Sequence, residues 1–187
     1  MDNHKSLLEN ILEKINKVSA SDTTQMMRLV VLNDEALETE ETSKKPFEIR
    51  REILKGWKIL INRDYQEGIS TSIKKAVEKC SSADIDGILL FLGDMPLVPE
   101  AVIEQVINES RAHPRRFVRP YYRDVPGFPV FIPRRFFKEL LTLTGDDGAK
   151  RIINEHSEDI EVIQTDERGC IFDIDQKQDL KKIQKSV

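Results

Sequence analysis

The sequence predicts an α/β protein: a three-layer α/β/α, Rossmann-like sandwich around a mainly parallel sheet, with residues 1–187 in a single domain. Apolar runs of strand length alternate with helical patterns along the chain, as in proteins built from β-α-β units. The run at 88–92 is apolar without alternation, which is typical of a central parallel strand covered on both faces. The length suits one hydrophobic core, and no repeat or low-complexity linker divides it.

The first third of the chain carries two predicted strands and the helices beside them. Leucine and isoleucine recur at helical spacing over 5–18, which predicts an amphipathic helix. Short apolar runs at 28–32 and 57–61, each followed by Asn, predict strands. The polar and acidic residues 34–46 are expected to form a connector, and 47–55 a helix that ends before a glycine.

The rest of the chain continues the alternation. A helix is predicted from Gly68 to about Cys80, because the glycine is followed by hydroxyl residues that favour a helix start and an anion nearby. Beyond 88–92, the patterns predict further helices and strands. The helices are expected at 99–111, 133–143, up to about 154, and 177–185, and the strands at 117–120 (with Arg119 at its end), 127–133, 160–164 and 170–174.

Composition and charge exclude several classes of function. The net charge of -4 leaves no basic excess for general binding to nucleic acid or to a membrane surface. No apolar run approaches the roughly 20 residues that span a bilayer, and the N-terminus does not resemble a signal peptide. Two distant cysteines, Cys80 and Cys170, form neither a metal motif nor a disulfide framework. These features together predict a cytoplasmic protein.

Asp94 is the first candidate for chemistry. Gly93 lets the backbone turn out of the predicted strand and Pro96 ends it, so Asp94 is expected at the strand's carboxyl end. Open α/β sheets bind their ligands at that edge, and a carboxylate there suits Mg²⁺ beside a nucleotide phosphate. Alternatively, Asp94 caps the helix expected at 99–111, and the two roles are compatible.

Asp173 and Asp175 are the second pair of candidates. They are two residues apart, so in a strand both carboxylates would point the same way. Beside Asp94 they would make an oxygen-rich site for Mg²⁺. The alternative is that Asp175 caps the C-terminal helix and Asp173 is solvated. The three histidines lie in polar surroundings, and no nucleophile system is indicated.

Four segments resemble, in order, motifs of the molybdenum cofactor nucleotidyltransferases, a MobA-like family of NTP transferases. The closest likeness is to the cytidylyltransferase branch, and the guanylyltransferase branch is a more distant relative. The segments are Asn-Arg-Asp-Tyr-Gln-Glu-Gly-Ile-Ser-Thr-Ser (62–72), Leu-Phe-Leu-Gly-Asp-Met-Pro (90–96), Gly-Phe-Pro (127–129) with Gly-Asp-Asp-Gly-Ala-Lys (145–150), and Phe-Asp-Ile-Asp (172–175) with Asp-Leu (179–180). The four segments span most of residues 57–181.

The resemblance implies a Rossmann-like nucleotidyltransferase fold and Mg²⁺-dependent transfer of CMP from CTP to molybdopterin, with release of pyrophosphate. It implies catalytic roles for Asp94 and Asp175, and a metal site formed by Asp94, Asp173 and Asp175. The nucleotide-binding residues would be Asn62, Gly68, Ser70 and Ser72. The acceptor-binding residues would be Gly127, Pro129, Gly145, Asp146 and Gly148.

The sequence also departs from the family pattern. Phe128 stands where a histidine is usual, Lys150 where an arginine is usual, and 176–178 replace Thr-Pro-Glu. The family's first strand and its triphosphate loop would precede the segment beginning at Lys5, so both are expected to be missing from this sequence. Three explanations stay open: an upstream start, a sheet completed by an oligomer or partner chain, or an inactive remnant that acts as a binding protein. Transfer from GTP, or to a sugar phosphate, is a further alternative.

Overall fold

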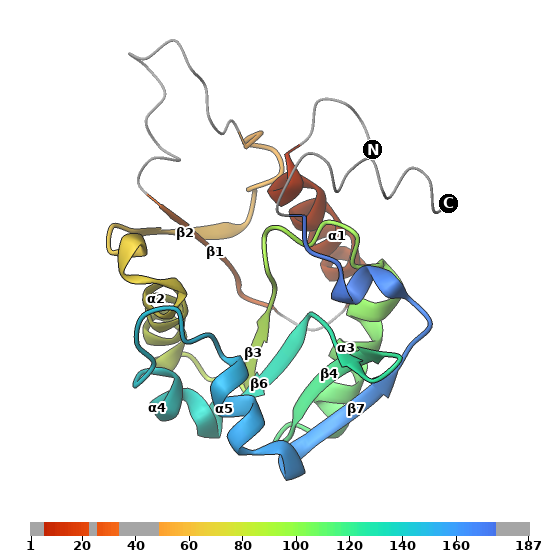
Figure 1. Cartoon of the computed structure of the whole chain (residues 1–187). Helices are drawn as coiled ribbons and strands as arrows, with labels where there is room; N and C mark the ends of the chain where they lie inside the picture. Colours follow the sequence, from red (N-terminus) through yellow and green to blue (C-terminus); the bar gives the residue numbers. More distant parts are fainter. Residues whose placement is uncertain (1–5, 23–25, 34–48, 175–187) are drawn as a thin grey trace, which may run out of the picture.

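A short parallel pair of strands forms the first of two sheets in the computed structural model, which describes residues 6–22, 26–33 and 49–174 (Figure 1). Strand β1 (Arg28–Asn33) lies parallel to β2 (Trp57–Asn62), with Val30 opposite Ile59. Helix α1 (Leu7–Ser21) is tied to this pair by Asn16, whose side-chain oxygen accepts hydrogen bonds from Arg28 Nη1 at 2.6 Å and Trp57 Nε1 at 2.7 Å.

The second sheet is mixed. Its strands are β3 (Gly87–Leu90), β6 (Val130–Pro133), β4 (Phe117–Tyr122) and β5 (Val125–Pro126) in that order, with β7 (Ile160–Gln164) also paired to β4. The β4–β7 ladder is parallel, whereas β3–β6, β4–β6 and β4–β5 are antiparallel. Because β3 and β4 both run antiparallel to β6, their carboxyl ends lie at the same edge of the sheet.

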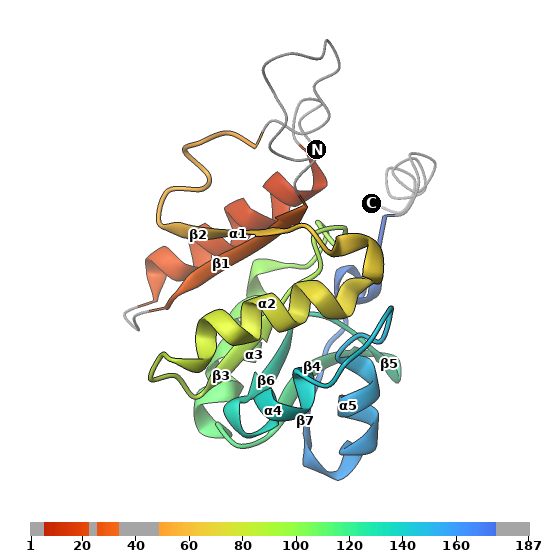
Figure 2. The ribbon, with the colours of Figure 1, turned by 90° about the vertical axis from the view of Figure 1, so that its left-hand side faces the viewer.

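Helices cover both faces of the strands, as Figure 2 shows for α2 (Ile69–Ser81) on one side. A buried apolar cluster joins α2, α4 (Phe137–Leu140) and α5 (Lys150–Glu155) to the strands. It includes Val77, Phe117, Ile132, Leu140 and Ile152. On the other side, α3 (Glu100–Ala112) packs Val102 and Val106 against Val118 and Phe131, and α1 packs Ile11 near Ile103. This confirms the predicted α/β/α layers. None of the described helices is long and apolar enough to cross a membrane.

The strand at 88–92 is shorter and differently paired than predicted. It ends at Leu90, runs antiparallel to β6 rather than within a parallel sheet, and all four of its residues are only half-buried. Among the described residues no strand pairs with its other edge, and none pairs with β1 on the side away from β2. Within the described residues β3 is therefore an edge strand, and an edge strand is less covered than a central one.

Two further sequence predictions are wrong. Within the predicted helix at 47–55, the described residues form turns. Their backbone groups bond to α1 instead: the Glu9 carboxylate accepts a hydrogen bond from the backbone N–H of Arg50, and the Asn16 side chain donates one to the carbonyl of Ile53. At 170–174 a 3₁₀ helix, η5 (Arg168–Ile171), replaces the strand. The Cys170 carbonyl accepts the N–H of Phe128 at 2.7 Å, so this backbone bonds to a loop instead of a ladder.

The predicted helix at 133–143 is divided into the 3₁₀ helix η3 (Arg134–Phe136) and α4. Arg134 holds its start, because its backbone N–H donates to the Asp86 carbonyl at 2.8 Å and its guanidinium donates to the Ser81 carbonyl at 2.8 Å. The predicted C-terminal helix at 177–185 and the connector at 34–46 lie outside the described residues.

We expect the free energy of unfolding to fall at acidic pH, because the buried carboxylate of Glu9, which is 2% exposed, becomes protonated. Burial raises the pKa of Glu9, but hydrogen bonds from the backbone N–H groups of Arg50 and Ser6 and from the Arg50 guanidinium outweigh it, so the pKa is lowered from 4.5. Because the folded-state pKa is lowered, the stabilisation is complete above 4.5 and is lost as pH falls through the lowered value.

Urea unfolding of wild type and Glu9→Gln at a series of acidic pH values measures this effect. The pH dependence should be weaker in Glu9→Gln than in wild type. Equal pH dependence in the two proteins would show that Glu9 does not supply it.

Candidate active site

Asp94 lies in the loop that follows β3, at the edge where β3 and β4 both end. Its side chain is half-buried, and its backbone carbonyl accepts a hydrogen bond from Ile174 N at 3.0 Å. Helix α3 has Pro99 at its N-cap and no side-chain cap, so Asp94 does not cap that helix. The hydrogen bond brings the segment of Asp173 to the segment of Asp94.

The segment that carries Asp173 is fixed by close backbone packing. A Cβ atom on Gly169 would lie 2.2 Å from the Leu97 carbonyl oxygen, so only glycine fits where η5 meets the loop after Asp94. Ile174 is buried, whereas Asp173 is exposed beside it. Asp175 lies outside the described residues, so its predicted role stays a prediction. Two described carboxylates thus come from neighbouring segments at one edge of the sheet.

Lys14 of α1 anchors the loop after Asp94. Its Nζ donates to the carbonyl oxygens of Pro96 at 2.7 Å and Val98 at 2.8 Å. Burial lowers the pKa of Lys14, and the negative charge of Glu100 opposes this shift. The sequence pattern placed Lys14 on a helix but gave no sign of this contact, which joins residues far apart in the chain.

Replacing Lys14 with Met is expected to cost about 1–3 kcal/mol, because two loop carbonyls lose a charged donor. Urea unfolding measures the loss. Lys17→Met is the matched control: it lies on the same helix, its side chain is 72% exposed, and it pairs with Glu100 at 2.7 Å. An exposed ion pair contributes at most about 1 kcal/mol, so equal losses in the two variants would contradict the anchoring role of Lys14.

The predicted nucleotide-binding residues form the turn between β2 and α2. Asn62 is 1% exposed, and its Nδ2 donates to Thr71 Oγ1 and Ser72 Oγ, both at 2.8 Å. Ser70 is also 1% exposed. Gly68 has a φ of +106°, a left-handed conformation that favours glycine, at the N-cap of α2. The side chains of Asn62 and Ser70 therefore shape the turn from inside.

The turn at Gly68 and the predicted acceptor turn at 145–148 touch each other. Ser70 N donates to the Gly145 carbonyl at 3.1 Å, and a Cβ atom on Gly68 would lie 2.2 Å from the same carbonyl group. Asp146 is exposed on this turn and Gly148 is half-buried. Segments assigned to nucleotide and to acceptor therefore form one continuous surface.

The remaining acceptor residues, Gly127 and Pro129, lie between β5 and β6. The Phe128–Pro129 peptide bond is cis, and a Cβ atom on Gly127 would lie 2.6 Å from the Cys170 carbonyl oxygen. The Gly127 carbonyl accepts hydrogen bonds from Arg119 Nε at 3.3 Å and Nη2 at 3.1 Å. Sequence reasoning placed Arg119 at a strand end without giving it a role; a charged residue within an apolar strand was the available signal.

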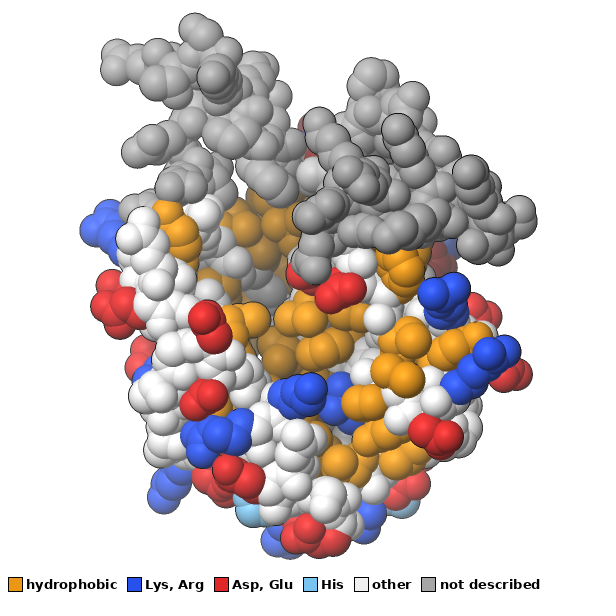
Figure 3. All heavy atoms as spheres, in the orientation of Figure 1, with side chains coloured by type: hydrophobic (Ala, Val, Ile, Leu, Met, Phe, Trp, Pro, Cys, Tyr) orange, Lys and Arg blue, Asp and Glu red, His pale blue; other side chains and the backbone are white. Residues whose placement is uncertain are grey.

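Figure 3 shows hydrophobic side chains gathered at the centre of the face that is turned to the viewer, with basic side chains directly beside them.

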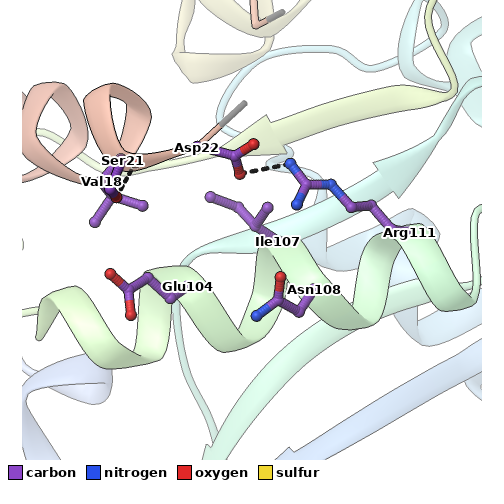
Figure 4. A pocket seen from close by; sticks show the side chains of 7 residues that line it. All are labelled: Val18, Ser21, Asp22, Glu104, Ile107, Asn108 and Arg111. Atoms are coloured by element: carbon purple, nitrogen blue, oxygen red, sulfur yellow. Dashed lines mark hydrogen bonds and ion pairs between the residues drawn. The ribbon is translucent and has the colours of Figure 1, made fainter. Parts of the chain in front are cut away.

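A separate cavity of about 260 Å³ lies between the C-terminal end of α1 and helix α3 (Figure 4). It is lined by Val18, Ser21, Asp22, Glu104, Ile107, Asn108 and Arg111. Asp22 and Arg111 form an ion pair at 2.5 Å across it, and none of the predicted site residues lines it. The cavity therefore does not belong to the candidate active site.

A third group of polar side chains, His156, Glu158 and Asp159, could approach a metal ion together. His156 Nε2 already contacts Glu139 Oε2 at 2.8 Å, and Asp159 pairs with Arg135 at 2.7 Å. These partners account for the arrangement without a metal.

Solved structures share this fold. Rv0371c of Mycobacterium tuberculosis H37Rv superposes with a TM-score of 0.76 at 22% identity, covering 100% of this chain and 88% of that one; a second structure of Rv0371c is a complex with manganese. A nucleotidyl transferase from Methanothermobacter superposes with a TM-score of 0.69 at 15% identity, covering 98% of this chain and 81% of that one. At such identities the likeness concerns the fold, which is that of the nucleotidyltransferases.

The family follows from the sequence comparison. The model of the MobA-like NTP transferase domain matches residues 3–160, most of the chain, which therefore belongs to this family. A curated relative, the purine catabolism protein PucB of Bacillus subtilis (strain 168), is 22% identical over 134 residues, or 71% of this chain. The matched region spans 64% of PucB.

Proposed function

We propose that this chain is a Mg²⁺-dependent nucleotidyltransferase of molybdenum cofactor maturation, which transfers CMP from CTP to molybdopterin. The observation that carries the proposal is the hydrogen bond from Ile174 N to the Asp94 carbonyl, which joins two acidic segments at the carboxyl edge of the strands. Membership of an NTP transferase family supports the reaction class, and the four ordered motifs support the cofactor-specific reaction.

The described carboxylates fit a divalent cation. Asp94 and Asp173 would supply hard oxygen ligands from neighbouring segments, and carboxylate oxygens are ligands that Mg²⁺ prefers. Asp175, outside the described residues, would be a third. The manganese complex of Rv0371c is consistent with divalent metal binding on this fold. When bound, the cation would neutralise the charge that develops on the pyrophosphate leaving group.

The proposed reaction needs no protein nucleophile. A phosphate oxygen of molybdopterin would attack the α-phosphorus of CTP, the bond from that phosphorus to the α,β-bridging oxygen would break, and pyrophosphate would leave. Catalysis of this kind consists of positioning and charge neutralisation. The joined turns at Gly68 and Gly145 would hold the nucleotide and the acceptor next to each other, and 127–129 would border the acceptor.

Pyrophosphate release measures the proposed activity. The purified chain is incubated with molybdopterin, Mg²⁺ and either CTP or GTP, with and without EDTA. We expect release with CTP, little with GTP, and none with EDTA. Omission of molybdopterin is the control for simple hydrolysis of CTP.

The outcomes separate the alternatives. Release with GTP instead of CTP would assign the guanylyl reaction, and release only with a sugar phosphate would assign another acceptor. Calorimetry then tests binding without turnover: CTP binding with no pyrophosphate release would favour a binding protein. No detectable heat at millimolar CTP or GTP with Mg²⁺ would overturn the proposal for this chain.

A further inference from the structure

Arg119 is a buried cation with no acidic partner among the residues that the structure describes. It is 5% exposed, it lies in β4, and no ion pair joins it to a described carboxylate. Burying a charge without a counter-charge is costly, because the group loses its hydration and gains no matching attraction. Burial accordingly lowers the pKa of Arg119, while Tyr121 and Cys170 act in the opposite direction.

Only part of the guanidinium is used. Nε and Nη2 both donate to one acceptor, the Gly127 carbonyl oxygen, at 3.3 and 3.1 Å. A guanidinium carries five N–H donors, so the donors of Nη1 have no partner within the described part of the chain. The Gly127 carbonyl is itself fixed, since Gly127 packs directly against the Cys170 backbone. These two hydrogen bonds therefore fix the orientation of the guanidinium through its Nε and Nη2 atoms.

The surroundings of Arg119 suit a ligand that is both flat and anionic. The guanidinium carbon lies 5.9 Å from the ring centroid of Tyr121 and 5.8 Å from that of Phe128. Both rings are half-buried, so each has surface left to contact a ligand. Arg119 also precedes the carboxyl end of β4, at the same edge of the sheet as the end of β3 that leads to Asp94.

We propose that Arg119 is the anion-binding residue of the acceptor side, taking a phosphate or carboxylate group of a ring-containing substrate on its Nη1 edge. Guanidinium groups bind these anions by charge-assisted hydrogen bonds with fixed geometry. The Tyr121 and Phe128 rings border the ring system that carries the anion. The identity of the acceptor rests on the proposed function, but the anion site itself is testable without turnover.

The first test compares thermal unfolding in inorganic phosphate and in chloride at equal ionic strength, with acetate as a separate arm. The Tm of wild type should be higher in phosphate or in acetate than in chloride. The Tm of Arg119→Met should be the same in all three. Arg115→Met is the matched control, because Arg115 is exposed in the turn before the same strand. No anion-specific gain in wild type, or an equal gain in Arg119→Met, would overturn the proposal.

A second measurement needs no variant. Phosphate should slow amide hydrogen exchange of wild type in peptides covering 119–129. Protection confined to the turns at 68–72 and 145–148 would place the anion elsewhere and overturn the proposal. CTP binding with Mg²⁺ is measured in parallel, so that loss of the nucleotide function is distinguished from loss of the anion site.

If turnover is found, Arg119→Lys should raise KM for the acceptor about tenfold or more and leave KM for CTP unchanged, because Lys lacks the second nitrogen of the fork. A purely structural role, in which Arg119 only holds Gly127, would raise both constants together.

Discussion

Gly68→Ala is expected to lower the free energy of unfolding by about 3 kcal/mol. Gly68 has a φ of +106°, where a side chain strains the backbone. The new Cβ would also lie 2.2 Å from the backbone of Gly145 and 2.7 Å from Asp146 N. These are backbone atoms, so no side-chain rotation relieves the contact. We expect the two turns to separate and the Ser70–Gly145 hydrogen bond to break.

Gly148→Ala is the matched control on the same surface. At Gly148 an added Cβ would meet only Ile69 Cγ2, at 4.0 Å, which is ordinary contact. Urea unfolding should show little change there and a large loss in Gly68→Ala, and hydrogen exchange should show the Ser70 amide opening only in the latter. Similar losses in the two variants would mean that contact between the turns does not stabilise the fold.

Gly68 illustrates what local patterns predict well. The three hydroxyl residues that follow it at 70–72 predicted a helix start, and α2 begins at the residue after Gly68. The helical spacing of 5–18 and 99–111 likewise predicted α1 and α3, because each helix buries one apolar face. Periodicity records which residues face the core, and this local information is sufficient for such elements.

Strand pairing and contacts between distant segments were predicted less well from local sequence patterns. The uninterrupted apolar run at 88–92 predicted burial but not direction, and β3 proved antiparallel to β6 and half-buried. Gly169 gave no sequence signal, since its role depends on the Leu97 carbonyl more than 70 residues away along the chain. A predicted strand at 170–174 failed for the same reason: its backbone bonds to Phe128, which no local pattern reveals.

The candidate site was predicted in part. Asp94, the turn at Gly68 and the turn at 145–148 were identified from motifs, and the structure joins the two turns. Lys14 and Arg119 were not given roles, because the carbonyls that they contact come from distant segments. Their significance depends on burial, which a one-dimensional pattern does not report for a single charged residue.

Asp94→Asn is expected to abolish the metal-dependent part of CTP binding and to lower turnover by about 100-fold or more. Asn has nearly the shape of Asp but supplies no negative charge to a divalent cation. The protein should stay folded and keep the hydrogen bond from Ile174 N, because that bond uses the backbone carbonyl of Asp94. Calorimetry with and without Mg²⁺, together with pyrophosphate release, measures both effects.

Asp84→Asn, an exposed aspartate before β3, controls for the general loss of one negative charge. A double-mutant cycle with Asp173→Asn then tests whether the two carboxylates act on one cation. If they share it, either single change removes most of the metal affinity, and the double variant is little worse than Asp94→Asn alone. Independent, additive losses of metal affinity would mean that Asp173 does not bind the same cation as Asp94. The backbone contact at Ile174 would then join two acidic segments that have no common ligand.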